Sequence, residues 1–247
     1  MALFASLATC TIWVHGQDNA SPERFVELND RAAVVFKEGK LEEAVGLLQE
    51  SIRLQPKNST SHGNLGEVFY WLGRYAESAA AFERAASLEP TKSLYHNALG
   101  VAYGKLGRPA EGIAAVEKAI AIDQVGVYYQ NVGSLFLQSG DSKRALPYME
   151  KAVALEPSDA DLRYALGYGY ARLSKNSQAI AELEKAVELD ANHADARTVL
   201  AHLFIKEGDR EKALEQYRWL ESNKSPAAAE LFAAISKGSV VRVPEKQ

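Results

Sequence analysis

One pattern recurs along this chain at a nearly constant interval. A small residue, glycine or alanine, marks each copy, and successive copies lie 33 or 34 residues apart. The six marking residues are Ala32, Gly66, Gly100, Gly133, Gly167 and Ala201. A period in this range predicts stacked supersecondary units, because each unit buries its apolar face only against its neighbours. We therefore expect the 247-residue chain to form one elongated domain rather than a closed globular core.

Each copy is expected to contain two α-helices joined by a tight turn. From Phe25 onward the apolar residues recur with helical spacing, and no segment shows the apolar–polar alternation of a strand. First helices should end at residues that tolerate a left-handed backbone, namely Gly39, Gly73, Gly107, Gly140, Ser174 and Gly208. Second helices should end before Pro56, Pro90 and Pro157, because proline cannot continue a helix. The pattern predicts an all-α chain.

These residues resemble the tetratricopeptide repeat family. The third copy supplies Leu99, Gly100, Tyr103, Gly107, Val116 and Ala119, and the second supplies Leu65, Gly66, Phe69, Gly73, Phe82 and Ala85. The resemblance implies a right-handed α-solenoid of about six helix-turn-helix repeats with a C-terminal capping helix. Pro109 fits the start of a second helix. Pro147 is expected to kink the second helix of the fourth copy or to shift its start.

The repeat and the resemblance together divide the chain into segments. Residues 1–16 are interpreted as a signal peptide, and residues 17–24 as a short linker. The solenoid spans residues 25–227, with repeats near 25–58, 59–92, 93–125, 126–159, 160–193 and 194–227. Residues 228–238 are expected to form the capping helix, and residues 239–247 a flexible tail.

The N-terminal residues allow three interpretations. Ala2–Val14 contains no charged residue, and 13 residues are too few to span a bilayer. The run fits the apolar region of a secretory signal peptide, which predicts a periplasmic or secreted protein. Leu7–Cys10 also resembles a lipoprotein acylation box. The third alternative is an apolar helix that covers the first repeat, and without export the protein would be cytoplasmic.

Composition and motifs argue against several classes of function. The chain has 28 basic and 32 acidic residues with no long run of either sign, so we expect no nucleic-acid surface. Cys10 is the only cysteine, which excludes an intramolecular disulfide and a cysteine-based zinc site. We find no phosphate-binding loop, metalloprotease motif or nucleophile elbow. The sequence therefore predicts a non-enzymatic protein without catalytic residues, metal or cofactor.

His62 and His96 fall at the same position in successive repeats, where the family carries tryptophan. One interpretation is a metal site, with Glu67 as a nearby carboxylate, which would make the protein a metal-dependent enzyme. The alternative is that both rings pack at a half-buried position. We favour packing, because two histidines without a third ligand at a suitable spacing give weak support for a metal.

The resemblance implies a binding surface on the first helices, which in this family line a concave groove that holds a peptide or partner segment. The corresponding residues are Asn29, Ala33, Phe36, Lys37, Asn64, Glu67, Tyr70, Trp71, Asn97, Val101, Lys105, Gln130, Ser134, Gln138, Tyr164, Tyr168, Arg172, Thr198, His202 and Lys206. Tyr164 and Tyr168 share one helix face, and aromatic residues of this kind are enriched in binding hot spots. The recurring basic residues favour a ligand with acidic groups. Alternatively, the aromatics pack between repeats and the basic residues stabilise helix C-termini.

Two further functional alternatives remain open. Family members that grip chaperone C-termini use a lysine and an asparagine in the first repeat, where this chain has Asn29 and Ala33. Only Asn64 keeps that pattern, so chaperone binding is not expected. The main hypothesis is a scaffold that binds a protein segment, with no membrane span. An envelope assembly or accessory factor with one dedicated protein partner is the alternative.

Overall fold

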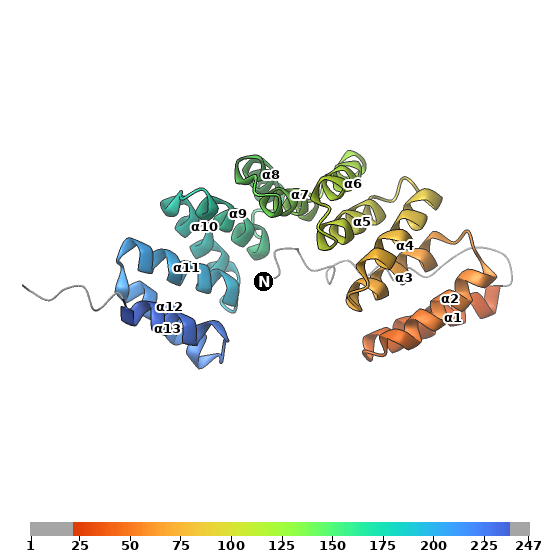
Figure 1. Ribbon diagram of the computed structural model, residues 1–247, viewed down its shortest axis with the longest axis horizontal. Coiled ribbons are helices and arrows are strands. Elements are labelled where there is room, and N and C mark those ends of the chain that lie inside the picture. Colours follow the sequence, from red (N-terminus) through yellow and green to blue (C-terminus); the bar gives the residue numbers. More distant parts are fainter. Residues whose placement is uncertain (1–21, 238–247) are drawn as a thin grey trace, which may run out of the picture. The chain divides into compact units, whose positions relative to one another are not determined.

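The computed structural model describes residues 22–237, which form thirteen α-helices and contain no strand (Figure 1). The helices are α1 (Pro22–Lys37), α2 (Leu41–Leu54), α3 (Ser59–Trp71), α4 (Tyr75–Leu88), α5 (Ser93–Lys105), α6 (Pro109–Ile122), α7 (Gly126–Gln138), α8 (Ser142–Leu155), α9 (Ala160–Arg172), α10 (Asn176–Leu189), α11 (Ala194–Glu207), α12 (Arg210–Ser222) and α13 (Ala227–Lys237). The predicted all-α repeat fold is confirmed. The interpretations placed on residues 1–16, 17–21 and 239–247 lie outside the described residues.

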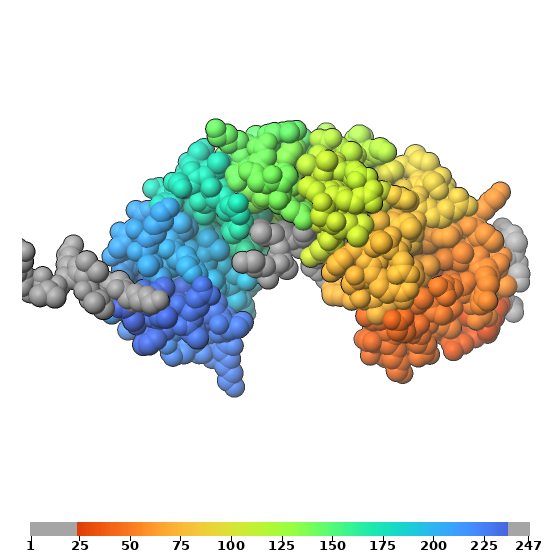
Figure 2. All heavy atoms as spheres, in the orientation of Figure 1, coloured from red at the N-terminus to blue at the C-terminus, as the bar shows by residue number. Residues whose placement is uncertain are grey.

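The chain divides into two compact units after Asp141. Unit 1 contains α1–α7, and unit 2 contains α8–α13. Within each unit every helix packs on the next one in the chain. The first helices of successive repeats also touch, α3 with α5 and α5 with α7 in unit 1, and α9 with α11 in unit 2. On the face shown in Figure 2, atoms of neighbouring helices within each unit are in continuous contact.

The first helices end at the residues that the sequence indicated. Five glycines adopt a left-handed backbone there, with φ between 72° and 83°. These are Gly39, Gly73, Gly107, Gly140 and Gly208. Ser174 takes the same conformation with φ of 57°, as predicted, and Lys224 does so with φ of 55° after α12, which the sequence did not indicate. The turn residues therefore define the helix hairpins of the fold.

Small residues let the two helices of a repeat approach closely. A Cβ added at Gly100 in α5 would lie 2.3 Å from Val116 Cγ2 and 2.7 Å from the carbonyl oxygen of Gly112, both in α6. A Cβ at Gly66 would lie 2.9 Å from the ring of Phe82. The marking residues of the repeat are therefore contact points between helix backbones. A side chain has no room there because protein interiors are close-packed.

The observed helix boundaries differ from the expected ones at three places. Helix α1 begins at Pro22, so residues 22–24, assigned to the linker from the sequence, form its first turn, where proline is favoured. Helix α13 begins at Ala227, one residue before the expected capping helix. Pro147 lies inside α8, which starts at Ser142 and continues past it to Leu155. The exposed Pro147 removes one backbone hydrogen bond without ending the helix.

Helix α13 covers the apolar face of the last repeat. It packs on both α11 and α12, and its Leu231 is fully buried beside Leu220 and Ala201. Repeat arrays need such a terminal element because the last unit has no further neighbour to bury its apolar face. Across residues 22–237, none of the helices combines the length and the apolar character that crossing a bilayer requires.

Candidate functional site

Each first helix packs one side against the second helix of its repeat, and the opposite side of the first helix faces away from that contact. In α3 the packing side carries His62, Gly66 and Phe69: Gly66 contacts Phe82 of α4, and His62 and Phe69 line a pocket between α3 and α4. An α-helix turns by about 100° per residue, so residues spaced by four, three and four positions share one face. In α3 these residues are Thr60, Asn64, Glu67 and Trp71. We call these four positions of each first helix the inner stripe.

The inner stripes of the other first helices follow from the repeat register. In unit 1 they are Val26, Asp30, Ala33 and Lys37 on α1; Leu94, Ala98, Val101 and Lys105 on α5; and Val127, Asn131, Ser134 and Gln138 on α7. In unit 2 they are Asp161, Ala165, Tyr168 and Arg172 on α9, and Asp195, Val199, His202 and Lys206 on α11.

The predicted groove residues divide into two groups by this geometry. Thirteen lie on inner stripes, namely Ala33, Lys37, Asn64, Glu67, Trp71, Val101, Lys105, Ser134, Gln138, Tyr168, Arg172, His202 and Lys206. Seven lie one face away, namely Asn29, Phe36, Tyr70, Asn97, Gln130, Tyr164 and Thr198.

Asn29 and Asn97 hold helices together. The Asn29 amide nitrogen donates to Ser51 Oγ at 2.8 Å and to the carbonyl of Phe25 at 3.0 Å, and its oxygen accepts from Ser61. Asn97 Oδ1 accepts a 2.8 Å hydrogen bond from Asn131 Nδ2, which joins α5 to α7. Both side chains are buried. Their assignment to the ligand surface is therefore corrected, because their polar atoms bond within the chain.

Asn64 occupies a different register position from Asn29 and Asn97. The residue of α3 that corresponds to Asn29 and Asn97 is Gly63. A Cβ at Gly63 would lie 2.5 Å from Tyr95 Cε1, so this position has room only for glycine. Asn64 lies on the adjacent face. Tyr70 also packs between helices, with its ring centroid 5.5 Å from that of Tyr75.

Buried acceptor atoms without a partner gather on the inner stripe of unit 1. Among the described residues, Asn64 Oδ1, Glu67 Oε2 and Asn131 Oδ1 are buried and accept no hydrogen bond. Asn64 is 1% exposed and Glu67 is 4% exposed. Burial raises the pKa of Glu67 to about 7, and a hydrogen bond from the Trp71 side chain opposes this rise. Trp71 itself is 49% exposed.

Two tyrosines lie on α9, the first helix of the fifth repeat. The ring centroids of Tyr164 and Tyr168 are 6.4 Å apart, and Tyr164 lies 4.9 Å from His193. Burial raises the pKa of Tyr164 to about 12, so its hydroxyl stays protonated at neutral pH. The Tyr168 hydroxyl accepts a 3.5 Å contact from Arg172 Nη1. These side chains offer an aromatic surface with hydroxyl groups at its edge.

The basic residues at the C-terminal ends of the first helices share a position but differ in their contacts. Lys37, Lys105, Arg172 and Lys206 lie in the last turns of α1, α5, α9 and α11, where a cation stabilises the helix dipole. Lys206 Nζ lies 3.4 Å from Asn176 Oδ1, and Gln138 Nε2 donates to the carbonyl of Gly104 at 2.8 Å. The exposed His202 contacts the Thr198 carbonyl at 2.8 Å.

His62 and His96 each tie the start of a first helix to the preceding loop. Their Nε2 atoms lie 3.0 Å and 2.9 Å from the carbonyl oxygens of Pro56 and Pro90, six residues earlier. Arg163 makes the equivalent bond to Pro157, and so does Arg197 to Ala191. The structure therefore assigns this position a packing role. Among residues 22–237, no three His, Cys, Asp or Glu side chains converge as metal ligands would.

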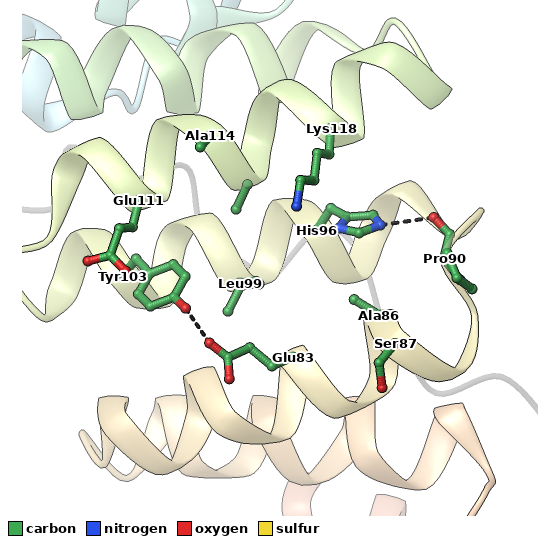
Figure 3. Close-up of a pocket in the computed structure, with 11 residues that line it drawn as sticks. Glu83, Ala86, Ser87, Pro90, His96, Leu99, Tyr103, Glu111, Ala114 and Lys118 are labelled. Atoms are coloured by element: carbon green, nitrogen blue, oxygen red, sulfur yellow. Dashed lines mark hydrogen bonds between the residues drawn. The ribbon is translucent and has the colours of Figure 1, made fainter.

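Two pockets on the other side of the first helices are one repeat apart. A pocket of about 700 Å³ contains His62, Phe69 and Arg84, and one of about 500 Å³ contains their counterparts His96, Tyr103 and Lys118. The two pockets lie on opposite flanks of α4. Figure 3 shows the second, in which the Tyr103 hydroxyl donates to Glu83 and His96 points to Pro90. Much of this polar lining is bonded within the chain.

Sequence reasoning missed His193, which begins α11. Its Nδ1 accepts a 3.2 Å hydrogen bond from the backbone nitrogen of Ala196, and its Nε2 lies 3.3 Å from Asp161 Oδ1. The proximity of His193 lowers the pKa of Asp161. Histidine is an uncommon helix cap, so its sequence position carries no signal for this role.

Known proteins that resemble this chain indicate its family and its fold. A family model described as tetratricopeptide repeat matches residues 29–92, 71–126, 133–196 and 164–225. Comparison with curated proteins gave no match.

Solved structures with a similar fold include a pilus biogenesis factor, the protein PilF and a protein with a peptide-binding site. PilW, a type IV pilus biogenesis factor, is 19% identical with a TM-score of 0.77, and the alignment covers 85% of this chain and 99% of that one. PilF of Pseudomonas aeruginosa is 16% identical with a TM-score of 0.71, covering 85% and 97%. YrrB, a repeat protein with an unusual peptide-binding site, is 20% identical with a TM-score of 0.56, covering 78% and 98%. At these identities the similarity establishes the fold.

Proposed function

The chain belongs to the tetratricopeptide repeat family, and from that premise we propose that it is a non-catalytic module that binds a segment of a partner protein along its inner stripes. The observation that carries this proposal is the set of unpartnered acceptors on α3 and α7, Asn64 Oδ1, Glu67 Oε2 and Asn131 Oδ1. A buried acceptor without a hydrogen bond is costly, by about 1–3 kcal/mol. A bound polypeptide supplies N–H donors that would satisfy such atoms.

The aromatic residues on the stripes support the same proposal. Trp71 is 49% exposed and Tyr168 is half-buried. Tryptophan and tyrosine contribute large contact areas with few rotatable bonds, and they are enriched in binding hot spots. Helices that are already ordered lower the conformational cost of binding. In unit 2, Arg172 and Lys206 would suit acidic groups of a segment bound to that unit.

Site-specific photo-crosslinking tests this proposal in the native host. A photoreactive phenylalanine analogue replaces Trp71 in one variant and Tyr168 in another, while the control variant carries it at Lys118 on the outer surface. We expect one protein to crosslink from both stripe positions and not from the control. Crosslinking from the Lys118 variant alone, or equal capture from all three, would contradict binding along the inner stripes.

An assembly factor with one dedicated partner is the second candidate function. The similarity to PilW along 99% of that chain favours it, as does the apolar run Ala2–Val14, which would export the protein. Export predicts that the mature protein recovered from the host envelope begins after residue 16, which N-terminal sequencing measures. A dedicated partner predicts copurification in a fixed stoichiometry. Recovery of the protein with an intact N-terminus in the cytoplasm would contradict an envelope role.

A further inference from the structure

Helix α3 contains both satisfied and unsatisfied buried polar side chains. Ser61 bonds to Asn58, Asn29 and Ser51, and therefore closes a network between α1, α2 and α3. Asn64 and Glu67 lie on the inner stripe of the same helix and keep one oxygen each without a donor. Since most buried polar groups in proteins are hydrogen-bonded, this difference within one helix requires an explanation. The two residues that carry these oxygens are about one helical turn apart in α3.

The environment of Glu67 distinguishes it from the other unpartnered groups. A buried carboxyl group is stabilised in its ionised form by a nearby cation, and burial without one favours the neutral acid. Desolvation and the Trp71 hydrogen bond are the causes of its pKa shift, and no charged side chain is among them. Of the ion pairs formed among the described residues, none includes Glu67. The chain therefore provides no counter-charge for this carboxyl group.

The neighbouring helices have the opposite charge pattern on their inner stripes. Helices α1 and α5 carry Lys37 and Lys105 at the stripe position that Trp71 occupies in α3. At the position of Glu67 they carry Ala33 and Val101. Helix α3 thus combines an acidic group with an exposed indole ring, where its neighbours combine an apolar residue with a lysine. Charge complementarity points to a ligand group that is cationic at α3.

We propose that Asn64, Glu67 and Trp71 form a subsite that receives the cationic side chain, lysine or arginine, of the protein segment bound to unit 1. The ammonium or guanidinium group donates hydrogen bonds to Glu67 Oε2 and Asn64 Oδ1, and its alkyl stem and charge pack against the Trp71 ring. This inference rests on the proposed function, because it assigns a residue type to one position of the bound segment.

The test uses a positional-scanning library of heptapeptides that are acetylated and amidated. Capped ends leave the side chains as the only charges, so enrichment of a cation reports side-chain recognition. The full chain and its Glu67→Gln variant are screened in parallel. The control is Glu43→Gln, which removes the same charge at an exposed residue of α2. Circular dichroism and a thermal melt establish that each variant is folded.

We expect the full chain to enrich lysine or arginine at one position. Replacing that residue by norleucine should then weaken binding at least about tenfold, because the buried carboxylate loses its partner. For the Glu67→Gln variant, the two peptides should bind within about twofold of each other, whereas Glu43→Gln should behave as the full chain. Trp71→Ala changes an exposed residue and gives a second variant. Its ratio of affinities for the lysine and norleucine peptides should fall to less than half of the ratio measured for the full chain.

Three contrary outcomes have different meanings. If the full chain selects peptides without a basic position, or if Glu67→Gln keeps the same preference for lysine, the cationic subsite is overturned while binding along the inner stripes stands. If the library yields no binder at all, both the subsite and the binding of extended segments are overturned. Binding of a free polyamine in competition with neutral peptides would also overturn recognition of a protein side chain.

Discussion

A single buried carboxyl group makes the stability of this protein depend on pH. Folding raises the pKa of Glu67 from 4.5 to about 7, so between these values the native state keeps a proton that the unfolded state releases. The stabilisation is therefore fully present below pH 4.5 and is lost as the pH rises through 7. The loss amounts to about 3 kcal/mol if the whole shift is realised.

We expect the Glu67→Gln variant to remove this pH dependence, because glutamine is neutral throughout. Urea denaturation at several values between pH 4.5 and 8 gives the free energy of unfolding of both proteins. The wild type should lose stability relative to the variant as the pH rises across this interval. A constant difference between the two proteins would show that Glu67 titrates alike in the folded and unfolded states.

The marking glycines give a second prediction at the scale of one residue. Gly100→Ala should destabilise the protein by about 1–3 kcal/mol, because the new Cβ meets Val116 Cγ2 at 2.3 Å and a backbone oxygen at 2.7 Å. Gly46→Ala in α2 is the matched control. A Cβ at Gly46 would have no neighbouring atom within 4 Å, so this substitution at an exposed helix position should stabilise the protein by about 0.5–1 kcal/mol. Equal effects of the two substitutions in chemical denaturation would contradict the close-packing argument.

These residues also separate what the sequence can predict from what it cannot. Gly100 recurs in register with Gly66 and Gly167, so its packing role follows from the repeat. The state of Glu67 does not recur, because α1 and α5 carry Ala33 and Val101 at that position. Its unpartnered oxygen depends on which atoms surround it in space. Periodicity predicts shared packing, whereas an individual binding group needs the three-dimensional structure.

At the scale of helices, the turn after α9 is the exception among the first-helix turns that carry a left-handed residue. Ser174 adopts φ of 57° where five other first helices have glycine. An L-residue in this conformation is strained by about 1–2 kcal/mol. We expect Ser174→Gly to raise the unfolding free energy by about 1 kcal/mol. The reciprocal change Gly140→Ser should lower it. Thermal melts measure both, and a lower melting temperature for Ser174→Gly would contradict the strain.

The helix boundaries themselves were predictable where turn chemistry is explicit. Glycine and proline fixed most of the ends, because each restricts the backbone in a known way. The sequence was less informative at α8, since Pro147 is accommodated at an exposed position in its second turn. The sequence also shows the register of α3, because Gly63 lies three residues before Gly66, as Asn97 lies three residues before Gly100. The contact of Gly63 with Tyr95 gives the physical reason for a glycine there.

At the scale of the whole molecule, stability is expected to be local. Within each unit every helix packs on its neighbours in the chain, so a destabilised repeat affects distant repeats of its unit only through the intervening ones. In the Gly100→Ala protein, the backbone amides of α5 and α6 should exchange hydrogen with solvent faster than in the wild type. Amides of α9–α11 in unit 2 should keep their protection, which hydrogen exchange with mass spectrometry measures segment by segment. A uniform loss of protection along residues 22–237 would instead show that the repeats unfold as one cooperative body. The same experiment bears on binding, because a ligand seated on the α3 stripe should slow exchange in the helices of unit 1 that it contacts.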